Sequence, residues 1–393
     1  MQVLVCHPGR QHSHQLAMAL AEHGMLAKYV TGVPTRGDAG GWLARRLVPG
    51  KTDSYAIDID PALVRHVYFA KLVSKAAAMA CPPKMTATIS HRADALFDAW
   101  VCRWLSSERP HVVVAYENSA LHTFRRAKRL GITTVLDAAS VHHRWQDRFI
   151  EPPQSKIAHR LTNARKDAEI ALADHVLTVS AFARESYLDA GVSPARVYPV
   201  PVGVDYSQFK PRSEERRVSD RPAHDFRFVY VGNTGRLKGL DILSDAVRRL
   251  RHDGQECTVT MIGAGAETAK GLDTEIKRKG WMNHERLARE LPQHDVLILP
   301  SYFDSFGMVV AEAMACGLPV IVTQNVGAKE MVTPEVNGQV VPVGDAEALA
   351  SAMRWFLANR AKLPGMSQAA RLAAERYDWW HYRRRVVELL QSL

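Results

Sequence analysis

The sequence predicts an α/β protein made of two successive doubly wound units. Short aliphatic runs recur along the chain and alternate with helical patterns, which is typical of parallel sheets covered by helices. Residues 200–225 interrupt this alternation with proline, glycine and charged residues, and a second series of the same kind follows. We therefore expect a first domain over residues 1–205 and a second domain over residues 206–376.

The first domain opens with a strand, a loop and a helix that ends at Gly24. Four of its strands are expected at QVLVC (2–6), HVVVAY (111–116), ITTVLD (132–137) and HVLTVS (175–180). Because a strand begins at residue 2, we expect no signal peptide.

The second domain repeats the alternation. Its strands are expected at FRFVYVG (226–232), CTVTMIG (257–263), DVLIL (295–299) and PVIVT (319–323). The end of the chain, residues 377–393, is aromatic, basic and helical in pattern. It predicts either a helix that crosses back onto the first domain or a last helix of the second domain.

The segment PSYFDSFGMVVAEAMACGLPV (300–320) is nearly apolar, yet it carries two acids, Asp304 and Glu312, with seven residues between them. Ser305 is placed to cap a helix whose apolar pattern runs to Ala315. Strands flank this helix on both sides, so the unit indicates a parallel sheet.

Asp304 falls beyond the carboxyl end of a strand, where ligands bind in parallel sheets. Glu312 lies about two helical turns further, which is about 10 Å at roughly 1.5 Å rise per residue. The amides of Phe306, Gly307 and Met308 would lie between the two acids, where a helix start attracts phosphate. This spacing suits a nucleotide-sugar. The alternative is that the acids only complement a helix dipole and that Glu312 is an ordinary half-exposed residue.

The segment VGNTGRLKGLDIL (231–243) reads as a strand, a glycine-containing turn and a helix start. Arg236 and Lys238 fall in the turn. Two cations beside backbone amides and a helix N-terminus can bind a pyrophosphate. A solvated basic turn is the alternative.

Charge is uneven along the chain. The net charge is +10, and residues 1–210 hold 26 Lys and Arg against 18 Asp and Glu. A basic first half indicates an anionic partner, such as lipid headgroups or a diphosphate-linked acceptor. No nucleic-acid-binding motif is present, so nucleic acid is not an expected partner.

The five cysteines are scattered and odd in number. None of their spacings is that of metal ligands, so we expect reduced thiols in a cytoplasmic protein. The DID at 58–60 precedes a helix that starts with proline, so we interpret it as a cap and turn and expect no metal site there. No stretch reaches the length of a membrane helix.

Several segments together resemble the retaining glycosyltransferases of family 4. PSYFDSFGMVVAEAMACGLPVI (300–321) matches that family's pattern of an acid, seven residues and Glu, continued by E-A-M-A-x-G-x-P-V. Supporting segments occur in the family's order: ADHVLTVSAFARES (173–186), PVGVDYSQFKP (201–211), VGNTGRLKG (231–239), HERLARELPQHDVLILPS (284–301) and NGQVVPVGDAEALASAM (337–353). The resemblance implies two Rossmann-like domains facing across a cleft (the GT-B architecture). The nucleotide-sugar would lie on the second domain and the acceptor mainly on the first.

By this resemblance, Glu312 binds the ribose hydroxyls and Asp304 holds the donor sugar. Lys238 and Arg236 face the leaving diphosphate. The family usually has Glu in place of Asp304, one methylene longer, and Arg in place of Asn233, whose charge Arg236 replaces. The other donor-binding residues expected are Ser305, Phe306, Gly307, Met308, Gly232, Asn233 and Gly9, the last being what remains of a glycine pair in the first loop. Since cations and amides stabilise the diphosphate, no essential metal and no cofactor are expected beyond the UDP- or GDP-hexose co-substrate.

Histidines of the first domain are candidates for the acceptor side. DAASVHHRWQDR (137–148) follows a strand end, where the family places an active-site His. We prefer His142 over His143 because the spacing S-x-H-x-R-x-Q resembles a variant found in polysaccharide-building members. We expect His142 to hold the sugar or the acceptor hydroxyl. Also assigned to the acceptor side are Arg144, His12 and His14.

The segment GGWLARRLVPGK (40–51) sets Trp42, Leu43 and Leu47 beside Arg45 and Arg46. It predicts an interfacial anchor on an anionic membrane, or else a loop that folds over the cleft.

Taken together, these features predict a cytoplasmic or peripheral-membrane hexosyltransferase that retains the anomeric configuration. Its acceptor would be a hydroxyl of a lipid-linked or envelope polysaccharide intermediate. The alternatives are a nucleotide-sugar epimerase of the same architecture and a catalytically degenerate nucleotide-sugar-binding protein.

Overall fold

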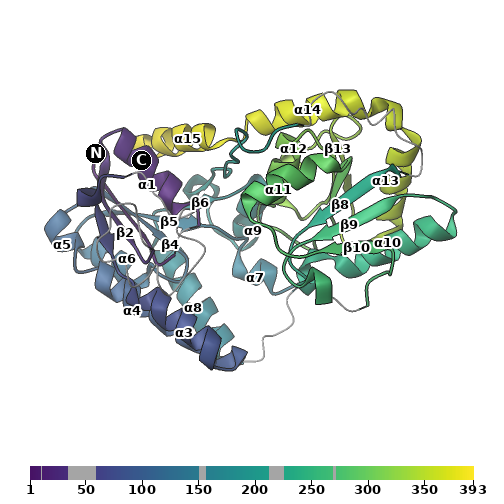
Figure 1. Ribbon diagram of the computed structural model, residues 1–393. Coiled ribbons are helices and arrows are strands. Elements are labelled where there is room, and N and C mark those ends of the chain that lie inside the picture. Colours follow the sequence, from purple (N-terminus) through teal and green to yellow (C-terminus); the bar gives the residue numbers. More distant parts are fainter. Residues whose placement is uncertain (10, 34–58, 150–155, 212–224, 269–270) are drawn as a thin grey trace. The chain divides into compact units, whose positions relative to one another are not determined.

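The computed structural model describes residues 1–9, 11–33, 59–149, 156–211, 225–268 and 271–393 (Figure 1). The predicted membrane anchor at 40–51 lies outside these residues, as does the part of the predicted linker from 212 to 224. The chain divides into two compact units. Unit 1 comprises Met1–Val179, Arg184–Val200 and Arg383–Leu393, and unit 2 comprises Ser180–Ala183 and Pro201–Tyr382.

Unit 1 is built on a seven-stranded parallel sheet in the order β3-β2-β1-β4-β5-β6-β7. The strands are β1 (Val3–His7), β2 (Leu26–Thr31), β3 (Val64–His66), β4 (Val112–Tyr116), β5 (Thr133–Ala138), β6 (His175–Thr178) and β7 (Val197–Pro199). The four strands expected from the sequence are β1, β4, β5 and β6. The sequence analysis missed β2, β3 and β7, because β3 and β7 are three-residue edge strands and Lys28 interrupts the apolar run of β2.

Helices cover both faces of this sheet (Figure 1). They are α1 (Ser13–Glu22), α3 (Phe69–Ala80), α4 (Pro83–Val101), α5 (Leu105–Glu108), α6 (Leu121–Arg129), α7 (His143–Gln146) and α8 (Lys156–Leu172), with α9 (Ala181–Asp189) shared with unit 2 and short turns η2 (Pro61–Leu63) and η3 (Pro194–Arg196). Asp60 caps η2, because its side chain accepts from the amide of Ala62 at 2.9 Å. This confirms the interpretation of Asp60 as a cap.

The last helix, α15 (Trp379–Ser392), belongs to unit 1 from Arg383 onward. The guanidinium of Arg383 donates to Gln15 Oε1 at 2.8 Å and to Glu22 Oε1 at 2.6 Å, both on α1. The end of the chain therefore packs on the first helix of the chain (Figure 1).

Unit 2 has a six-stranded parallel sheet in the order β10-β9-β8-β11-β12-β13. Its strands are β8 (Arg227–Val231), β9 (Thr258–Ile262), β10 (Ile276–Lys279), β11 (Val296–Leu299), β12 (Val320–Thr323) and β13 (Gly338–Val341). Its helices are α10 (Leu240–His252), α11 (His284–Glu290), α12 (Met308–Ala315), α13 (Ala346–Ala358) and α14 (Leu363–Glu375), with short turns η6 (Arg236–Lys238), η7 (Ala266–Thr268), η8 (Leu291–Gln293), η9 (Gly327–Met331) and η10 (Arg360–Lys362).

The strand order reverses between β1 and β4 in unit 1 and between β8 and β11 in unit 2. In doubly wound sheets, ligands bind beyond the carboxyl ends of the strands at this reversal. The segments that follow β8 and β11 carry the predicted donor residues other than Gly9, and those that follow β1 and β5 carry the predicted acceptor residues together with Gly9.

All five cysteines have free thiols, which confirms the expectation that they are unpaired. Within the described ranges, no helix is both long and apolar enough to span a bilayer.

Candidate functional site

The reversal point of unit 2 brings two predicted site residues into direct contact. Lys238, in the turn η6 after β8, donates from Nζ to Oδ2 of Asp304, which follows β11, at 2.6 Å. Their side chains are 25% and 21% exposed, so the pair is screened from water only in part. A cation and a carboxylate from the two strands at the reversal thus form one polar centre.

Gly239 makes this contact possible. Its φ is +66°, and a Cβ at this position would lie 2.0 Å from the carbonyl oxygen of Pro300. Tyr302 also donates its amide to the carbonyl of Leu237 at 2.8 Å. The turn after β8 is therefore held against the segment after β11, and a larger residue at position 239 would push Lys238 away from Asp304.

The predicted capping role of Ser305 is wrong. Helix α12 starts at Met308, after Gly307 in the left-handed region with φ +89°. The backbone before Gly307 is extended, because Asp304 forms a parallel bridge with Val326.

That extended segment is fixed by a neighbouring loop rather than by the helix. Asp304 donates its amide to Asn325 O at 2.9 Å and accepts from Gly327 N at 2.9 Å, and Phe306 O accepts from Ala328 N at 2.6 Å. The carbonyl of Ser305 accepts from Ser180 Oγ at 2.6 Å. Because α12 starts at Met308, only one of the three amides predicted to bind an anion lies within the helix, and the anion-binding role of all three stays a prediction.

Glu312 is buried in α12, contrary to the alternative of a half-exposed helix residue. It is only 6% exposed, and burial raises its pKa to about 7. Among the described residues, His284 approaches this carboxylate, but its Nε2 lies 3.8 Å from Oε1, beyond hydrogen-bonding distance. A buried carboxylate of this kind is unfavourable unless a ligand supplies hydrogen-bond donors.

The other donor-site candidates build the turn after β8. The side chain of Asn233 accepts from Gly235 N at 2.9 Å, and its carbonyl accepts from the hydroxyl of Tyr230 at 2.8 Å. Gly232 donates its amide to Ile262 at 2.9 Å. Burial raises the pKa of Tyr230, and the nearby charge of Asp304 adds to this effect. Asn233 therefore shapes the turn, a role that the sequence comparison with Arg did not suggest.

Arg236 is exposed and lies in the same turn as Lys238. Burial raises the pKa of Tyr302, a hydrogen bond to Asp241 adds to this rise, and the charge of Arg236 opposes it. The two predicted cations therefore lie on one turn beside the segment that follows β11.

In unit 1, His12 contacts a carboxylate that the sequence analysis did not single out. His12 Nε2 lies 2.9 Å from Oδ1 and 3.0 Å from Oδ2 of Asp137, at the end of β5. His14 is buried on α1, and Gly9 donates its amide to His7 Nδ1 at 2.7 Å. The available signal for Asp137 was its position at the end of a predicted strand.

His142 is held in one orientation and one tautomer. It caps α7, where its Nδ1 accepts from the amide of Arg144 at 3.2 Å, and its own amide donates to Ser186 Oγ at 2.8 Å. Burial lowers the pKa of His142 to about 4, with a smaller contribution from His143. Since a neutral ring that accepts at Nδ1 carries its proton on Nε2, His142 presents an N–H donor rather than a base.

Glu117, at the carboxyl end of β4, is a second residue that sequence reasoning missed. Its carboxylate accepts from Ser140 Oγ and from the hydroxyl of Tyr187, each at 2.6 Å, and lies 3.6 Å from Lys166 Nζ. The ring of Tyr187 meets that of His142 edge-on at 5.0 Å. Glu117 therefore fixes the residues that surround His142.

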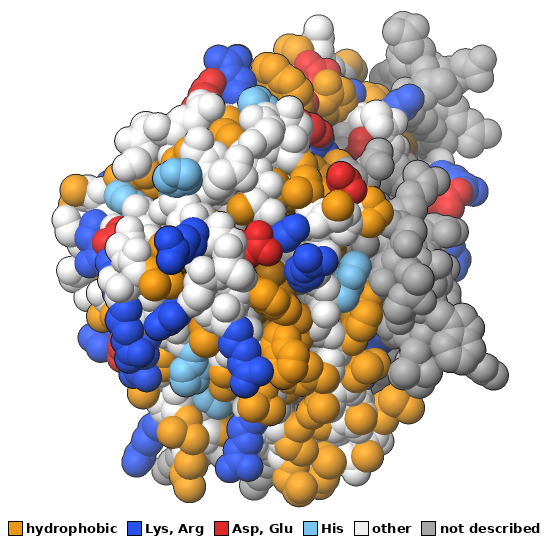
Figure 2. Space-filling model, turned by 90° about the vertical axis from the view of Figure 1, so that its left-hand side faces the viewer, with side chains coloured by type: hydrophobic (Ala, Val, Ile, Leu, Met, Phe, Trp, Pro, Cys, Tyr) orange, Lys and Arg blue, Asp and Glu red, His pale blue; other side chains and the backbone are white. Residues whose placement is uncertain are grey.

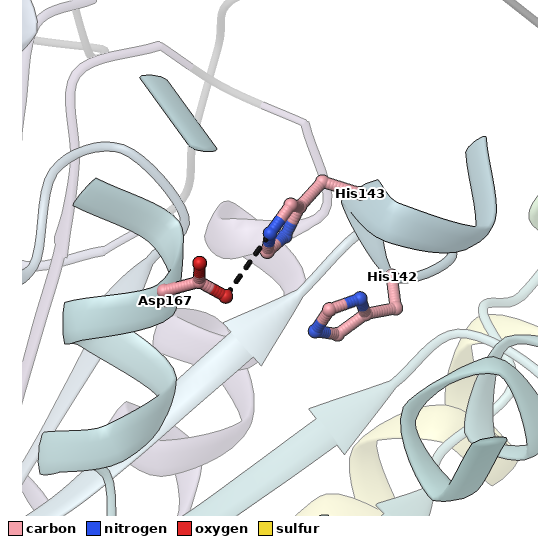
Figure 3. Close-up of side chains that lie close together, drawn as sticks. All are labelled: His142, His143 and Asp167. Carbon is pink, nitrogen blue, oxygen red and sulfur yellow. Dashed lines mark ion pairs between the residues drawn. The ribbon is translucent and has the colours of Figure 1, made fainter. Parts of the chain in front are cut away.

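His143 and Asp167 complete this part of unit 1 (Figure 3). Oδ1 of Asp167 lies 3.1 Å from Nε2 of His143, and Oδ2 accepts from Arg144 at 3.1 Å. Ligand atoms of His142, His143 and Asp167 all lie within 4.8 Å of one another, so these three residues could hold a metal ion.

Comparisons with known proteins cover both units. Two family models match the chain, one described as Glycosyltransferase Family 4 over residues 79–208 and one described as Glycosyl transferases group 1 over residues 211–373. A D-inositol 3-phosphate glycosyltransferase of Xylanimonas cellulosilytica is 26% identical over 326 residues, which span 74% of this chain and 70% of the relative.

Two solved structures match the described fold. Sucrose-phosphate synthase from Thermosynechococcus elongatus aligns with a TM-score of 0.72 and 21% identity over 100% of this chain and 99% of the other. The Anabaena protein HepE in complex with UDP aligns with a TM-score of 0.66 and 16% identity over the whole of both chains. These likenesses confirm the predicted pair of parallel-sheet α/β domains.

Proposed function

The chain belongs to the glycosyltransferases of family 4, and from this premise we propose that it moves a hexose unit from a UDP- or GDP-sugar to a hydroxyl group with retention of configuration. We assign the nucleotide-sugar to unit 2 and the acceptor to unit 1. The acceptor we propose is a lipid-linked or envelope polysaccharide intermediate.

The observation that carries the donor assignment is the buried carboxylate of Glu312. It lies on α12, downstream of the first-turn amides that start at Met308, and it has a pKa raised to about 7 by burial. Two ribose hydroxyls would give this carboxylate the donors that the described residues do not supply. Asp304, at the start of the same segment, would then accept from hydroxyls of the donor sugar.

Lys238 and Arg236 would stabilise the leaving diphosphate. Both belong to the turn beside the reversal of strand order, and Lys238 already contacts Asp304 at 2.6 Å. When the bond between the sugar and the diphosphate breaks, negative charge grows on the diphosphate oxygen, and preorganised cations stabilise it without a bound metal. The acceptor oxygen would form the new bond on the same face of the sugar, and the departing diphosphate oxygen would take its proton. No side chain is then required as a strong base.

His142 would hold an acceptor hydroxyl as a hydrogen-bond donor. Its Nδ1 is engaged by Arg144 N, so Nε2–H is the group available to a substrate oxygen. The low pKa of about 4 keeps the ring neutral near pH 7, so it adds no charge to the acceptor side. Arg144 and the His12–Asp137 pair would supply further polar contacts in unit 1.

A membrane surface is the proposed location of the acceptor. On α3 and α4 of unit 1, large apolar side chains are exposed beside cations: Val73, Met79, Met85, Leu96 and Trp100 with Lys71, Arg92 and Arg103. Figure 2 shows this mixture of hydrophobic and basic side chains on the lower part of the face it presents. Apolar groups that enter the headgroup region and cations that attract anionic lipid are the two features of interfacial binding.

A direct assay tests the proposal. The full chain is incubated with UDP- or GDP-hexoses and a panel of lipid-linked glycans, and nucleotide release and the anomeric configuration of the product are measured. The proposal requires a glycoside with the donor's configuration. A donor that is epimerised without acceptor would identify an epimerase. Nucleotide-sugar binding without any turnover would identify a binding protein.

A further inference from the structure

His143 and Asp167 form a cluster with His142, and the proposed transfer reaction gives neither of these two neighbours a role (Figure 3). The two histidines are adjacent at the start of α7, and Asp167 faces them from α8. Their rings are stacked with centroids 4.3 Å apart, and all three residues belong to unit 1.

His143 is the unusual member. It is only 3% exposed, and neither of its ring nitrogens has a hydrogen-bond partner among the described residues. Asp167 Oδ1 lies 3.1 Å from its Nε2, yet the contact lacks hydrogen-bond geometry. The buried imidazole nitrogen of His143 and a carboxylate oxygen of Asp167, whose side chain is 42% exposed, approach without bonding to each other, as two ligands of a common third atom would.

We propose that this cluster binds a divalent transition-metal ion of the Zn²⁺ class through His142 Nε2, His143 Nε2 and Asp167. Imidazole nitrogens and carboxylate oxygens hold zinc at about 2.0–2.2 Å, which places neighbouring ligand atoms about 3.4 Å apart in a tetrahedral site. The 3.1 Å contact is close to this spacing and the full set of ligand atoms lies within 4.8 Å, so the three side chains would have to move closer together to complete the site. A fourth position remains for water or a substrate oxygen.

The neighbouring charges permit a cation. The positive charge of Lys166 is offset by the carboxylate of Glu117, which lies 3.6 Å from its Nζ. Arg144 contacts the other oxygen of Asp167 at 3.1 Å, and its side chain is 64% exposed, so it can orient the carboxylate or turn outward. Coordination by His142 Nε2 requires the ring proton to move to Nδ1, which gives up the bond from Arg144 N.

Metal binding would therefore change the state of His142. The proton on Nε2 is replaced by the metal ion, so the ring no longer donates from that atom. This consequence rests on the proposed function: if His142 holds an acceptor hydroxyl, then Zn²⁺ inhibits transfer reversibly.

The test uses the metal-free full chain and Zn²⁺ in competition with a chromophoric chelator. The variants are His143→Asn and Asp167→Asn, and the matched control is His159→Asn, which breaks a half-buried His159–Asp147 pair with a 3.0 Å contact. Outer-shell partners alone are worth roughly 10–100-fold in metal affinity, so loss of a ligand should weaken zinc binding by more than about tenfold. The control should bind as the unaltered chain does, and Co²⁺ should give a d–d absorption band that both cluster variants lose.

Equal zinc affinity and stoichiometry in the unaltered chain and in both cluster variants would overturn the site. In the transferase assay, inhibition should follow the binding curve, reverse with EDTA, and be absent from His143→Asn relative to its own zinc-free rate. Zinc that binds at the cluster without slowing transfer would overturn the acceptor role of His142 while leaving the metal site in place.

Discussion

Replacing Glu312 by Gln should stabilise the ligand-free protein at neutral and alkaline pH and should lower its affinity for the nucleotide-sugar donor. The folded structure raises the pKa of Glu312 from 4.5 to about 7 because the carboxylate is buried. Each pKa unit corresponds to about 1.4 kcal/mol, so ionising this carboxylate in the folded state costs about 3 kcal/mol.

The sign follows from proton binding. Between pH 4.5 and about 7 the folded state holds a proton on Glu312 that the unfolded state has lost, so the contribution of this residue to stability falls as pH rises through that interval. The E312Q variant has no titrating group at this position, so it does not undergo this loss. The difference in unfolding free energy between E312Q and the unaltered chain should therefore grow by about 3 kcal/mol from about pH 4.5 to about pH 8.

Urea denaturation without nucleotide, followed across this pH range, measures the difference. The change with pH is the readout, because any constant effect of burying an amide cancels. Glu285→Gln, at a 65% exposed position on α11, is the control and should show no such trend. A stability difference between E312Q and the unaltered chain that does not vary with pH would refute the buried-carboxylate reasoning.

Calorimetry with UDP, GDP and their sugars measures the second expected effect, which is the change in donor affinity. Charge-assisted hydrogen bonds are worth roughly 1.5–3 kcal/mol, so E312Q should bind the donor about 10- to 150-fold more weakly. Unchanged donor affinity in E312Q would contradict the ribose assignment, even if the pH trend is found.

Three further outcomes are expected. Alanine at both Lys238 and Arg236 should lower turnover by at least about 100-fold, since one preorganised donor to a developing charge is worth that much. The control Lys277→Ala, at an exposed position of β10, should have no effect on turnover. Near-normal turnover of the double variant would mean that the diphosphate binds elsewhere. EDTA should leave transfer intact, because the proposed cations replace a metal, and a complete loss restored by Mg²⁺ or Mn²⁺ would oppose this. Vesicles of anionic lipid should bind the chain at low salt and release it as ionic strength rises, because the Debye length falls to about 3 Å at 1 M. The double variant Lys71→Glu with Arg92→Glu should abolish this binding without altering donor affinity. If the chain does not bind anionic vesicles at low salt, the membrane part of the proposal is wrong.

Much of unit 2's site was predictable from local sequence. Strand β11 is a continuous apolar run and β8 is apolar or aromatic after Arg227, and Lys238 and Asp304 lie in the segments that follow these two strands. Because parallel strands carry their ligands at their carboxyl ends, position along the chain was enough to bring these two residues to one edge of the sheet.

Tertiary structure decided what those residues do there. The backbone at Asp304 is extended rather than helical because Asn325 and Gly327 supply its hydrogen bonds, and no pattern near Ser305 reports on that loop. The burial of Glu312 likewise depends on what packs over α12, which an apolar helix pattern does not reveal.

The first unit shows the same division. The sequence by itself identified His12 and His142 as polar residues that follow strands β1 and β5, because turn and strand patterns are set by neighbouring residues. Only the fold joined His12 to Asp137, which is 125 positions away in the chain, and brought His143 to Asp167. Such pairs form when the sheet stacks strands distant in sequence and helices pack on it, so side-chain partners depend on long-range packing that local patterns do not encode.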